Sequence, residues 1–469
     1  MPAIPTPGLI QRPGVAWRPV RYELMETTRR TLDRAAVEAQ RASRTPALAA
    51  GVAHRGDPLW TAGVGAADLA DPSVPLGPDT QFLIASNTKT FTATMVLQLR
   101  DEGRLRLDDP VDDHPPGSTH PGVTVRQLLA HASGMQREPV SPEFWDTLEV
   151  PDAERFVEDW NATERVLEPH TAWHYSNLGY LVLGEIVAHA DGRSWAESLR
   201  ARLLDPLGLR RTTLELQAPA AGLYYVPPFT DAPVDEHVLF TGILAAAGGL
   251  ASTVADLVRW HAFLLDPDEA ILRKDTVSEM LEPHAVPDPG LNVAWGLGFG
   301  IMRREGRSWF GHTGGAPGGI TGVFSDRESG LTGVVLMNNT GAKDPAATAI
   351  GFGEEVATND APPLEPWTPG AAPAPELLPL LGVWYSEGSA FEFRVQGGRL
   401  QAVAAGADPS TPPAVFTELG PDEYRTVSGR ERGERLLVRR REDGSVRMLH
   451  WATYRFTREP LGFSERAAD

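Results

Sequence analysis

The sequence predicts a mixed α/β (α+β) chain of two domains: a large one in which helices surround an antiparallel sheet, and a small all-β one at the C-terminus. Its 469 residues exceed the roughly 250 to 300 at which a single hydrophobic core stops growing. Strand-like segments flank a helical middle, and residues 360–376 are rich in Pro and Ala, which is typical of an extended linker. These observations place the main domain boundary at the linker.

The first domain opens with a helix and a pair of strands. Residues 20–42 contain neither Pro nor Gly, and residues 48–69 alternate apolar segments with Gly-containing turns, which predicts a helix followed by paired strands. In residues 86–100 large apolar side chains recur every four positions from Phe91, and Gly103 follows. That spacing with a glycine stop predicts a helix that begins at Ser86.

The middle of the domain is mostly helical and its end is mostly strand. Residues 124–134 and 176–192 predict short helices that end at Gly, and Thr253 with Asp256 predicts a capping box for a helix over 253–265. Short apolar segments with turn residues between them then predict an antiparallel sheet; they lie at 293–302, 308–313, 319–326 and 330–339. In the first of these, three alternating glycines are expected to leave gaps along one face of a strand.

Beyond the linker the chain is strand-like throughout. The turn sequences Gln-Gly-Gly and Glu-Asp-Gly-Ser predict hairpins between strands at 390–395, 399–405, 414–419, 434–441 and 446–457. The predicted organisation is therefore a domain over 1–359, of which 1–19 are an N-terminal extension, a linker over 360–376 and an all-β domain over 377–469.

Composition excludes several classes of function. The net charge of −19 argues against nucleic acid or an anionic membrane as a partner, because both demand a basic face. No membrane span is expected, since no run approaches roughly 18 apolar residues, and the chain start lacks the pattern of a signal peptide, which predicts a cytoplasmic location. The absence of Cys excludes disulfides, thiolate metal sites and a Cys nucleophile. The oligomeric state is left open.

Ser86 and Lys89 form a Ser-x-x-Lys segment on the predicted helix. A spacing of three stacks both side chains on one helix face, so the amine can take the proton of the hydroxyl if burial lowers its pKa. Only three of the 43 basic residues are Lys, namely Lys89, Lys274 and Lys343, and the rest are Arg. Of these two residue types only Lys can lose its proton. The helix N-terminus adds backbone N–H donors for an oxyanion. Taken alone, the segment is equally well interpreted as a surface helix turn.

Two further segments carry polar groups of the right kind. Tyr175 lies just before a predicted helix, where a phenol can relay a proton, and Asn177 could hold the lysine or a substrate amide. His312, Thr313 and Gly314 lie where an apolar strand meets small residues, an edge along which a substrate can lie and which supplies a second oxyanion donor. Taken alone, the Tyr175 segment also fits an ordinary turn with an Asn cap, and the His312 segment fits a Gly-rich hairpin.

The three segments together, in the order Ser-x-x-Lys, Tyr-x-Asn and His-Thr-Gly, resemble the penicillin-recognising serine hydrolases. The chain is similar over roughly residues 40–355 to the class C β-lactamases, D-aminopeptidases and related esterases. Supporting segments are TVRQLLAHASGM, GEIVAHADG, AAAGGLASTVADLVRW and WGLGFGI. The resemblance implies a β-lactamase/transpeptidase-like fold, and its first residues, LLPLLGVWY, make the C-terminal domain resemble the lipocalin-like barrels of some relatives.

The resemblance also implies a role for each matching residue. Ser86 is the expected nucleophile, Lys89 its base, Tyr175 the proton relay and Asn177 a positioning residue. The third motif is expected to bind substrate through His312, Thr313 and Gly314, and the backbone N–H groups of Ser86 and Gly315 are expected to form the oxyanion hole. No metal and no cofactor is implied.

The expected function is hydrolysis, through an acyl-enzyme, of a small-molecule or short-peptide amide or ester, such as a D-amino-acid peptide, a D-amino-acid amide or a small ester. A typical β-lactamase has Lys where this chain has His312, and a neutral imidazole binds a β-lactam carboxylate less firmly. A β-lactamase or penicillin-binding carboxypeptidase is therefore the alternative, and a non-catalytic peptide or lactam sensor is the second. The intact Ser86, Lys89 and Tyr175 argue against the sensor.

Other signals are weaker. His170 and His174 have a spacing that suits a metal on a helix, but Pro169 precedes them and no zinc signature surrounds them. No Gly-x-Ser-x-Gly elbow of the α/β-hydrolases occurs, and Ser133 lacks a nearby base.

Overall fold

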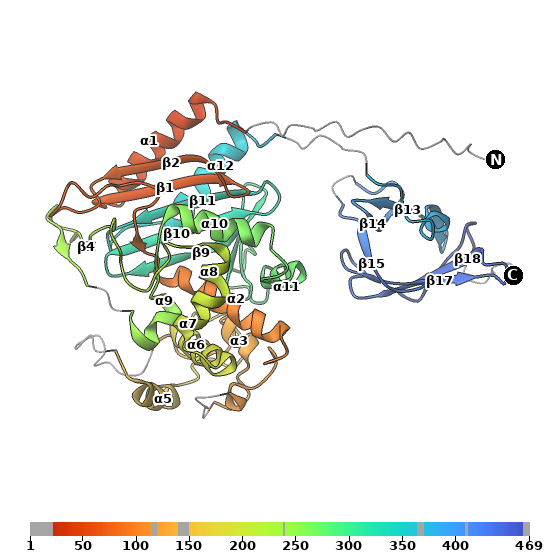
Figure 1. The fold of residues 1–469 in the computed structure, drawn as a ribbon, viewed down its shortest axis with the longest axis horizontal. Helices are drawn as coiled ribbons and strands as arrows, with labels where there is room; N and C mark the ends of the chain where they lie inside the picture. Colours follow the sequence, from red (N-terminus) through yellow and green to blue (C-terminus); the bar gives the residue numbers. More distant parts are fainter. Residues whose placement is uncertain are drawn as a thin grey trace. The chain divides into compact units, whose positions relative to one another are not determined.

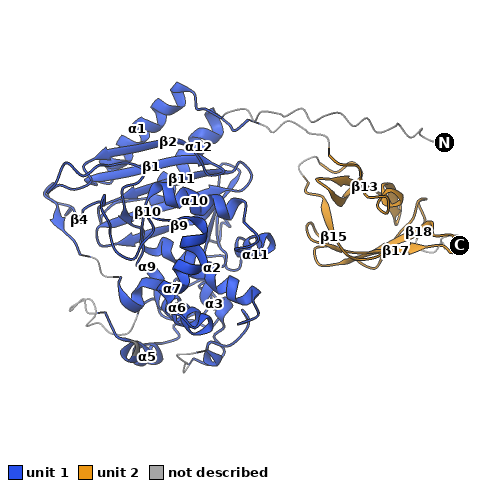
Figure 2. Cartoon of the chain, in the orientation of Figure 1, with its two compact units in different colours: residues 1–363 blue, residues 364–469 orange. Residues whose placement is uncertain are grey.

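The computed structural model describes residues 22–114, 120–138, 150–237, 240–363, 370–408 and 411–462. The predicted extension over 1–19 and residues 364–369 of the predicted linker lie outside this set. The chain divides into two compact units, Met1–Pro363 and Leu364–Asp469 (Figure 2), and each is described by itself.

A seven-stranded antiparallel sheet forms the centre of the first unit, in the order β2-β1-β11-β10-β9-β8-β7 (Figure 1). Its strands are β1 (Ala47–His54), β2 (Asp57–Gly65), β7 (Val293–Trp295), β8 (Gly300–Arg304), β9 (Arg307–Ala316), β10 (Gly319–Asp326) and β11 (Leu331–Met337). The first strand pairs with the last, Leu48 opposite Met337. The sheet is therefore complete only when the two ends of the unit come together.

Helices cover both faces of this sheet, as expected. On one face, α1 (Glu26–Ala42) and α12 (Pro345–Asn359) bury an apolar cluster against β1, β2 and β11 (Figure 1). On the other face α10 (Val254–Leu265) packs against β1, β10 and β11. Beyond it lies the helical part of the unit, which includes α2 (Thr88–Asp101) and α6 (Asn177–Asp191).

Shorter elements connect these parts. The helical ones are η1 (Ala85–Asn87), η2 (Val111–Asp113), α3 (Val125–Leu129), α5 (Ala153–Ala162), α7 (Trp195–Leu199), η3 (Arg200–Leu204), α8 (Asp205–Leu207), η4 (Gly242–Leu244), α9 (Ala245–Gly248) and α11 (Lys274–Met280). Two small ladders join β3 (Phe82–Leu83) to β6 (Ala251–Ser252) and β4 (Tyr224–Tyr225) to β5 (Val234–Asp235).

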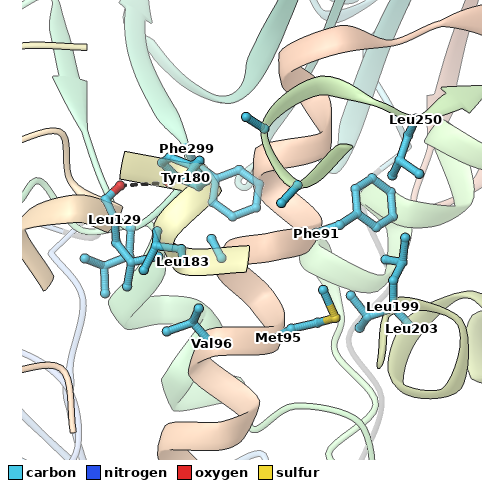
Figure 3. Packing of buried hydrophobic residues seen from close by; sticks show 14 of the residues in the cluster. Phe91, Met95, Val96, Leu129, Tyr180, Leu183, Leu199, Leu203, Leu250 and Phe299 are labelled. Atoms are coloured by element: carbon cyan, nitrogen blue, oxygen red, sulfur yellow. Dashed lines mark hydrogen bonds between the residues drawn. The ribbon is translucent and has the colours of Figure 1, made fainter. Parts of the chain in front are cut away.

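The helix α2 lies at the centre of the larger core and is buried on all sides from Thr88 to Leu99. Figure 3 shows its residues Phe91, Met95 and Val96 among side chains from neighbouring elements. The ring of Phe91 stacks on Trp260 of α10 at 4.2 Å between ring centres. Burial of this helix on all sides places Lys89, near its N-terminal end, inside the core.

Two local expectations are wrong. Gly296 and Gly298 lie in the turn between β7 and β8, not on a strand, because Gly298 adopts a φ of +94° and a Cβ there would lie 2.4 Å from the Cβ of Ala93 on α2. Half of the predicted capping box forms: the Thr253 side chain accepts the N–H of Asp256. The Asp256 carboxylate accepts instead the N–H of Arg211 at 2.8 Å.

The second unit is a nearly closed barrel of eight antiparallel strands in sequence order, β12 to β19. Backbone hydrogen bonds between Tyr385 and Thr457 join its first strand to the segment after the last. Thirteen buried residues, Trp384 and Phe393 among them, fill the interior. The strands are β12 (Gly382–Ser386), β13 (Ser389–Gln396), β14 (Arg399–Ala404), β15 (Ala414–Gly420), β16 (Glu423–Thr426), β17 (Arg435–Arg440), β18 (Val446–Trp451) and β19 (Tyr454–Phe456), after η5 (Leu378–Leu380).

Candidate active site

Ser86 lies in the single turn η1 that leads into α2. Ala85, just before it, has a φ of +45°, a region that L-residues rarely adopt. The Asn87 carboxamide holds this turn in place, because it donates to the carbonyl of Ile84 at 3.2 Å and to the hydroxyl of Thr321 on β10 at 2.9 Å. The turn is therefore fastened to the sheet, and Ser86 remains partly exposed.

Lys89 is completely buried one helical turn further on. Its Nζ lies 3.0 Å from the Ser86 Oγ and donates to the carbonyl of Ala247 on α9 at 2.6 Å. Burial lowers the pKa of Lys89 from 10.5 to about 7, with a smaller raising effect from the Glu138 charge and a smaller lowering effect from Arg137. About half of the amine is therefore neutral near pH 7, and its lone pair can accept the hydroxyl proton.

Tyr175 comes from the loop just before α6 and meets Ser86 from another side. Its ring centre lies 5.2 Å from the Lys89 Nζ. Burial raises the pKa of the Tyr175 phenol well above its usual value, and its hydrogen bond with Ser86 opposes this only in part. The phenol is consequently protonated at neutral pH, which makes Lys89 the better proton acceptor and Tyr175 a proton donor.

Strand β9 passes directly beside η1, the turn that carries Ser86. A Cβ at Gly314 would lie 2.1 Å from the carbonyl oxygen of Ile84, so only glycine lets the strand come this close. Gly315, the next residue, is exposed, and a Cβ there would touch only the end of Ile320 at 3.4 Å. The strand is therefore open to solvent at Gly315.

His312 on β9 is a neutral hydrogen-bond acceptor in this environment. Burial lowers its pKa to about 3, with a further lowering effect from Lys89. Its Nδ1 bonds the carbonyl oxygen of Thr313, and because a carbonyl only accepts, Nδ1 carries the proton. The buried Nε2 is then an acceptor without a protein partner, on a ring that lies beside Tyr175 at 6.2 Å between centres.

Asn177 contacts a carboxylate that the sequence motifs do not include. Its Nδ2 donates to the Glu138 Oε1 at 2.6 Å, and its N–H donates to the Arg137 carbonyl at 2.9 Å. Burial raises the pKa of Glu138, while Asn177 and the charges of Lys89 and Arg137 oppose the shift. The Arg137 guanidinium carbon lies 5.0 Å from the centre of the Tyr175 ring. Arg137 and Glu138 thus place one positive and one negative charge near Lys89 and Tyr175.

His131 is a further residue outside the three sequence motifs. Its fully buried ring packs on Tyr175 at 4.3 Å between centres. It belongs to TVRQLLAHASGM, a segment that supported the family resemblance as a whole without pointing to this side chain. Glu138 had no sequence signal, because a single Arg-Glu pair in a loop is ordinary surface composition.

The structure thus brings Ser86, Lys89, Tyr175 and His312 into one cluster, with Asn177 beside it through Glu138. His170 and His174 do not join a metal site: the described residues contain no group of three His, Cys, Asp or Glu side chains that could bind an ion. Across the same described ranges no helix has the length and apolar character needed to cross a bilayer.

Comparison with known proteins assigns a described family to the first part of the chain only. A family model described as Beta-lactamase matches residues 32–357, and a model described as a domain of unknown function (DUF7586) matches residues 373–458. The match to the first model covers more than half of the chain, whereas the second carries no functional information.

Individual relatives are similar over different lengths. The chain is 31% identical to penicillin-binding protein 4 of Amycolatopsis lactamdurans over 372 residues, which cover 73% of this chain and 90% of that protein. It is 29% identical to Beta-lactamase-like protein 2 of Dictyostelium discoideum over 55% of this chain, and it spans only 49% of that protein. A solved D-stereospecific amidohydrolase from a Streptomyces species has a TM-score of 0.60 and 28% identity, over 69% of this chain and 98% of that one.

Proposed function

The chain belongs to the Beta-lactamase family of serine hydrolases, and we propose that it cleaves D-amino-acid amides or short D-amino-acid peptides through an acyl-enzyme on Ser86, with small esters as further substrates. The observation that carries the proposal is the buried Lys89, whose pKa of about 7 and whose 3.0 Å distance to Ser86 suit a general base. An ordinary lysine would be almost entirely protonated at this pH.

In the proposed first step, the Ser86 Oγ attacks the acyl carbon while its proton passes to the neutral Lys89 amine. The backbone N–H groups of Ser86 and Gly315 stabilise the oxyanion. Lys89 then returns the proton through the protonated Tyr175 phenol to the leaving nitrogen or oxygen, and the bond to the leaving group breaks. In the second step water, deprotonated by Lys89, attacks the ester carbon and releases Ser86 with its proton.

Two side chains favour, as the substrate, an amide with a free amino group rather than a β-lactam. His312 offers a neutral acceptor where a β-lactam carboxylate would need a cation. The Glu138 carboxylate, held by Asn177, can pair with the ammonium group of a D-amino acid. The similarity to a D-stereospecific amidohydrolase supports the same choice. The proposed partner is accordingly a small molecule or a short peptide.

The proposal is tested with the purified chain. A fluorophosphonate should label Ser86, and Ser86→Ala should abolish both labelling and turnover while the circular dichroism spectrum is unchanged. Among substrates, D-alanine amide and D-phenylalanine amide should be cleaved faster than their L-enantiomers and faster than the β-lactam nitrocefin. Equal turnover of Ser86→Ala would refute the site, and turnover of nitrocefin alone would refute the substrate class.

The boundary at the linker over 360–376 and the separate barrel are part of the proposal. A chain that ends at residue 363 should fold and be labelled at Ser86, because the described site residues lie before that position. An insoluble or unfolded truncation would show that the barrel completes the core of the first unit. The cytoplasmic location and the absence of nucleic-acid binding stay predictions, which cell fractionation and a DNA mobility-shift assay would test.

A further inference from the structure

Three of the contacts that the loop residue His131 makes converge on Tyr175, and its ring also packs on Tyr180 and Trp295. Its ring lies nearly parallel to the phenol ring, at 4.3 Å between centres and 30° between planes. Its carbonyl accepts the N–H of His174 at 2.8 Å, and its Nδ1 accepts the N–H of Ser176 at 3.1 Å. The residues before and after Tyr175 are thus both fastened to His131, and the ring between them packs on its imidazole.

These bonds fix the tautomer of the imidazole. Because the Ser176 N–H donates to Nδ1, that nitrogen carries no proton, and the neutral ring is protonated at Nε2. Burial and the nearby charge of Lys89 lower the pKa of His131 well below its usual value, which agrees with this assignment. A second proton would remove the acceptor for Ser176 and place a cation beside Lys89.

Two features show that this arrangement has a cost in stability. The Nε2 of His131 is buried without a hydrogen-bond partner, which typically destabilises a protein by about 1 to 3 kcal/mol. The backbone of His131 has a φ of +54°, in the left-handed region that residues other than Gly rarely adopt. An apolar ring at this position would pack without a buried unpaired nitrogen, so packing alone does not account for histidine.

We propose that His131 is a positioning residue for proton transfer, whose neutral Nδ1 and carbonyl hold the Tyr175 phenol against Ser86. The proposal rests on the proposed acyl-enzyme function and assigns to this buried ring a part in the same reaction. His131 itself touches neither the nucleophile nor the substrate. Its effect passes through Tyr175, and a shift of the phenol by about 1 Å can slow a reaction by about 10²-fold.

The test separates the acceptor from the bulk of the ring. In His131→Asn the side-chain oxygen branches from Cγ, as Nδ1 does, and can accept from Ser176. In His131→Gln the oxygen lies one atom further out, at the place of Nε2, and in His131→Leu there is no acceptor. His261 provides the matched control, because it is also fully buried and neutral, and its Nδ1 bonds the Ser325 hydroxyl at 2.8 Å, away from the cluster around Ser86.

We expect kcat for an activated ester to fall about 10²-fold in His131→Leu and His131→Gln while KM stays within about threefold, and to recover to within about tenfold of the parent in His131→Asn. His261→Leu should lower the melting temperature and leave kcat within about twofold. All rates refer to the folded fraction measured by near-UV circular dichroism, and if His131→Leu does not fold, the comparison of Asn with Gln decides.

Equal activity of the Asn and Gln variants would overturn the proposal, as would an effect confined to KM or a kcat of His131→Leu within about twofold of the parent. The parent protein and Ser86→Ala test the acyl-enzyme function separately. Loss of labelling in Ser86→Ala with no difference among the His131 variants would leave that function intact and refute the positioning role alone.

Discussion

Replacement of Lys89 by Arg keeps the positive charge and removes the base. With a pKa of about 7, about half of Lys89 is neutral at pH 7, compared with about one molecule in 3,000 for a lysine at its ordinary pKa. A guanidinium stays protonated at any usable pH. Loss of general-base assistance costs a factor of about 10² to 10⁴, which is about 3 to 5.5 kcal/mol of barrier.

The assay is the rate of Ser86 acylation by an activated ester, measured in the burst phase between pH 5 and pH 9. Because only the neutral amine accepts a proton, the parent rate should rise about tenfold per pH unit up to about pH 7 and then level off. In Lys89→Arg the rate should be lower and should lack this rise. A bulkier side chain that only displaced Ser86 would lower the rate equally at every pH and leave the shape unchanged.

Lys274 supplies the control for the same substitution, since its Nζ pairs with Asp266 at 3.0 Å on the surface, and Lys274→Arg should leave the profile as it is. The reasoning would be refuted by a Lys89→Arg variant that acylates within about fivefold of the parent near neutrality and keeps the rise with pH. Tyr175 would then be the base.

Three more predictions follow from the packing. Gly314→Ala should slow acylation about 10²-fold, because its Cβ would lie 2.1 Å from the Ile84 carbonyl; parental kinetics would show that β9 does not position the turn. His261 has a folded pKa of about 3 against an ordinary 6.5, so its contribution to stability is complete above about pH 6.5 and is lost as the pH falls toward 3. Urea unfolding of His261→Leu should show a dependence on pH that is weaker than that of the parent by about 1.4 kcal/mol per pH unit in this range, and identical slopes would contradict the buried neutral state. Asp191, whose side chain is 1% exposed, pairs with Arg202 at 2.6 Å and Arg193 at 2.8 Å, so Asp191→Ala should lower the free energy of unfolding by about 3 to 5 kcal/mol, whereas Asp266→Ala at the surface should cost under about 1 kcal/mol. Equal costs would mean that the Asp191 network is no stronger than a surface pair.

The parts of the site that depend on local spacing could be predicted from the sequence. A separation of three residues on a helix suffices to bring Ser86 and Lys89 together, and the strand pattern around His312 suffices to place it on β9. Short apolar segments with turn residues between them likewise predicted β10 and β11, because both strands are almost completely buried. In these places a short-range pattern determines the geometry.

The rest depends on contacts between distant segments. The Asp256 side chain does not complete the predicted capping box, because it accepts the backbone N–H of Arg211, 45 residues earlier, at 2.8 Å. Glu138 and His131 lie near Tyr175 and Asn177 because the loop that carries them packs against the start of α6 and the residues before it. No local sequence pattern predicts that contact. The turn at Gly298 follows from its contact with α2, which a strand-like run of apolar residues does not reveal.

The pairing of β1 with β11 has a consequence for the order of events during synthesis. Leu48 cannot pair with Met337 until the ribosome has added the residues between them, about 290 in number. At a synthesis rate of about 5 to 20 residues per second, their addition takes about 15 to 60 s. During this time the apolar strand β1 has only β2 as a neighbour, and the exposed edge of such a hairpin favours association with other chains. The nascent chain already carries Ser86 and Lys89 but still lacks β9, which lies beside them in the finished fold. The turn that carries Ser86 can therefore pack against β9 only after most of the first unit has been synthesised.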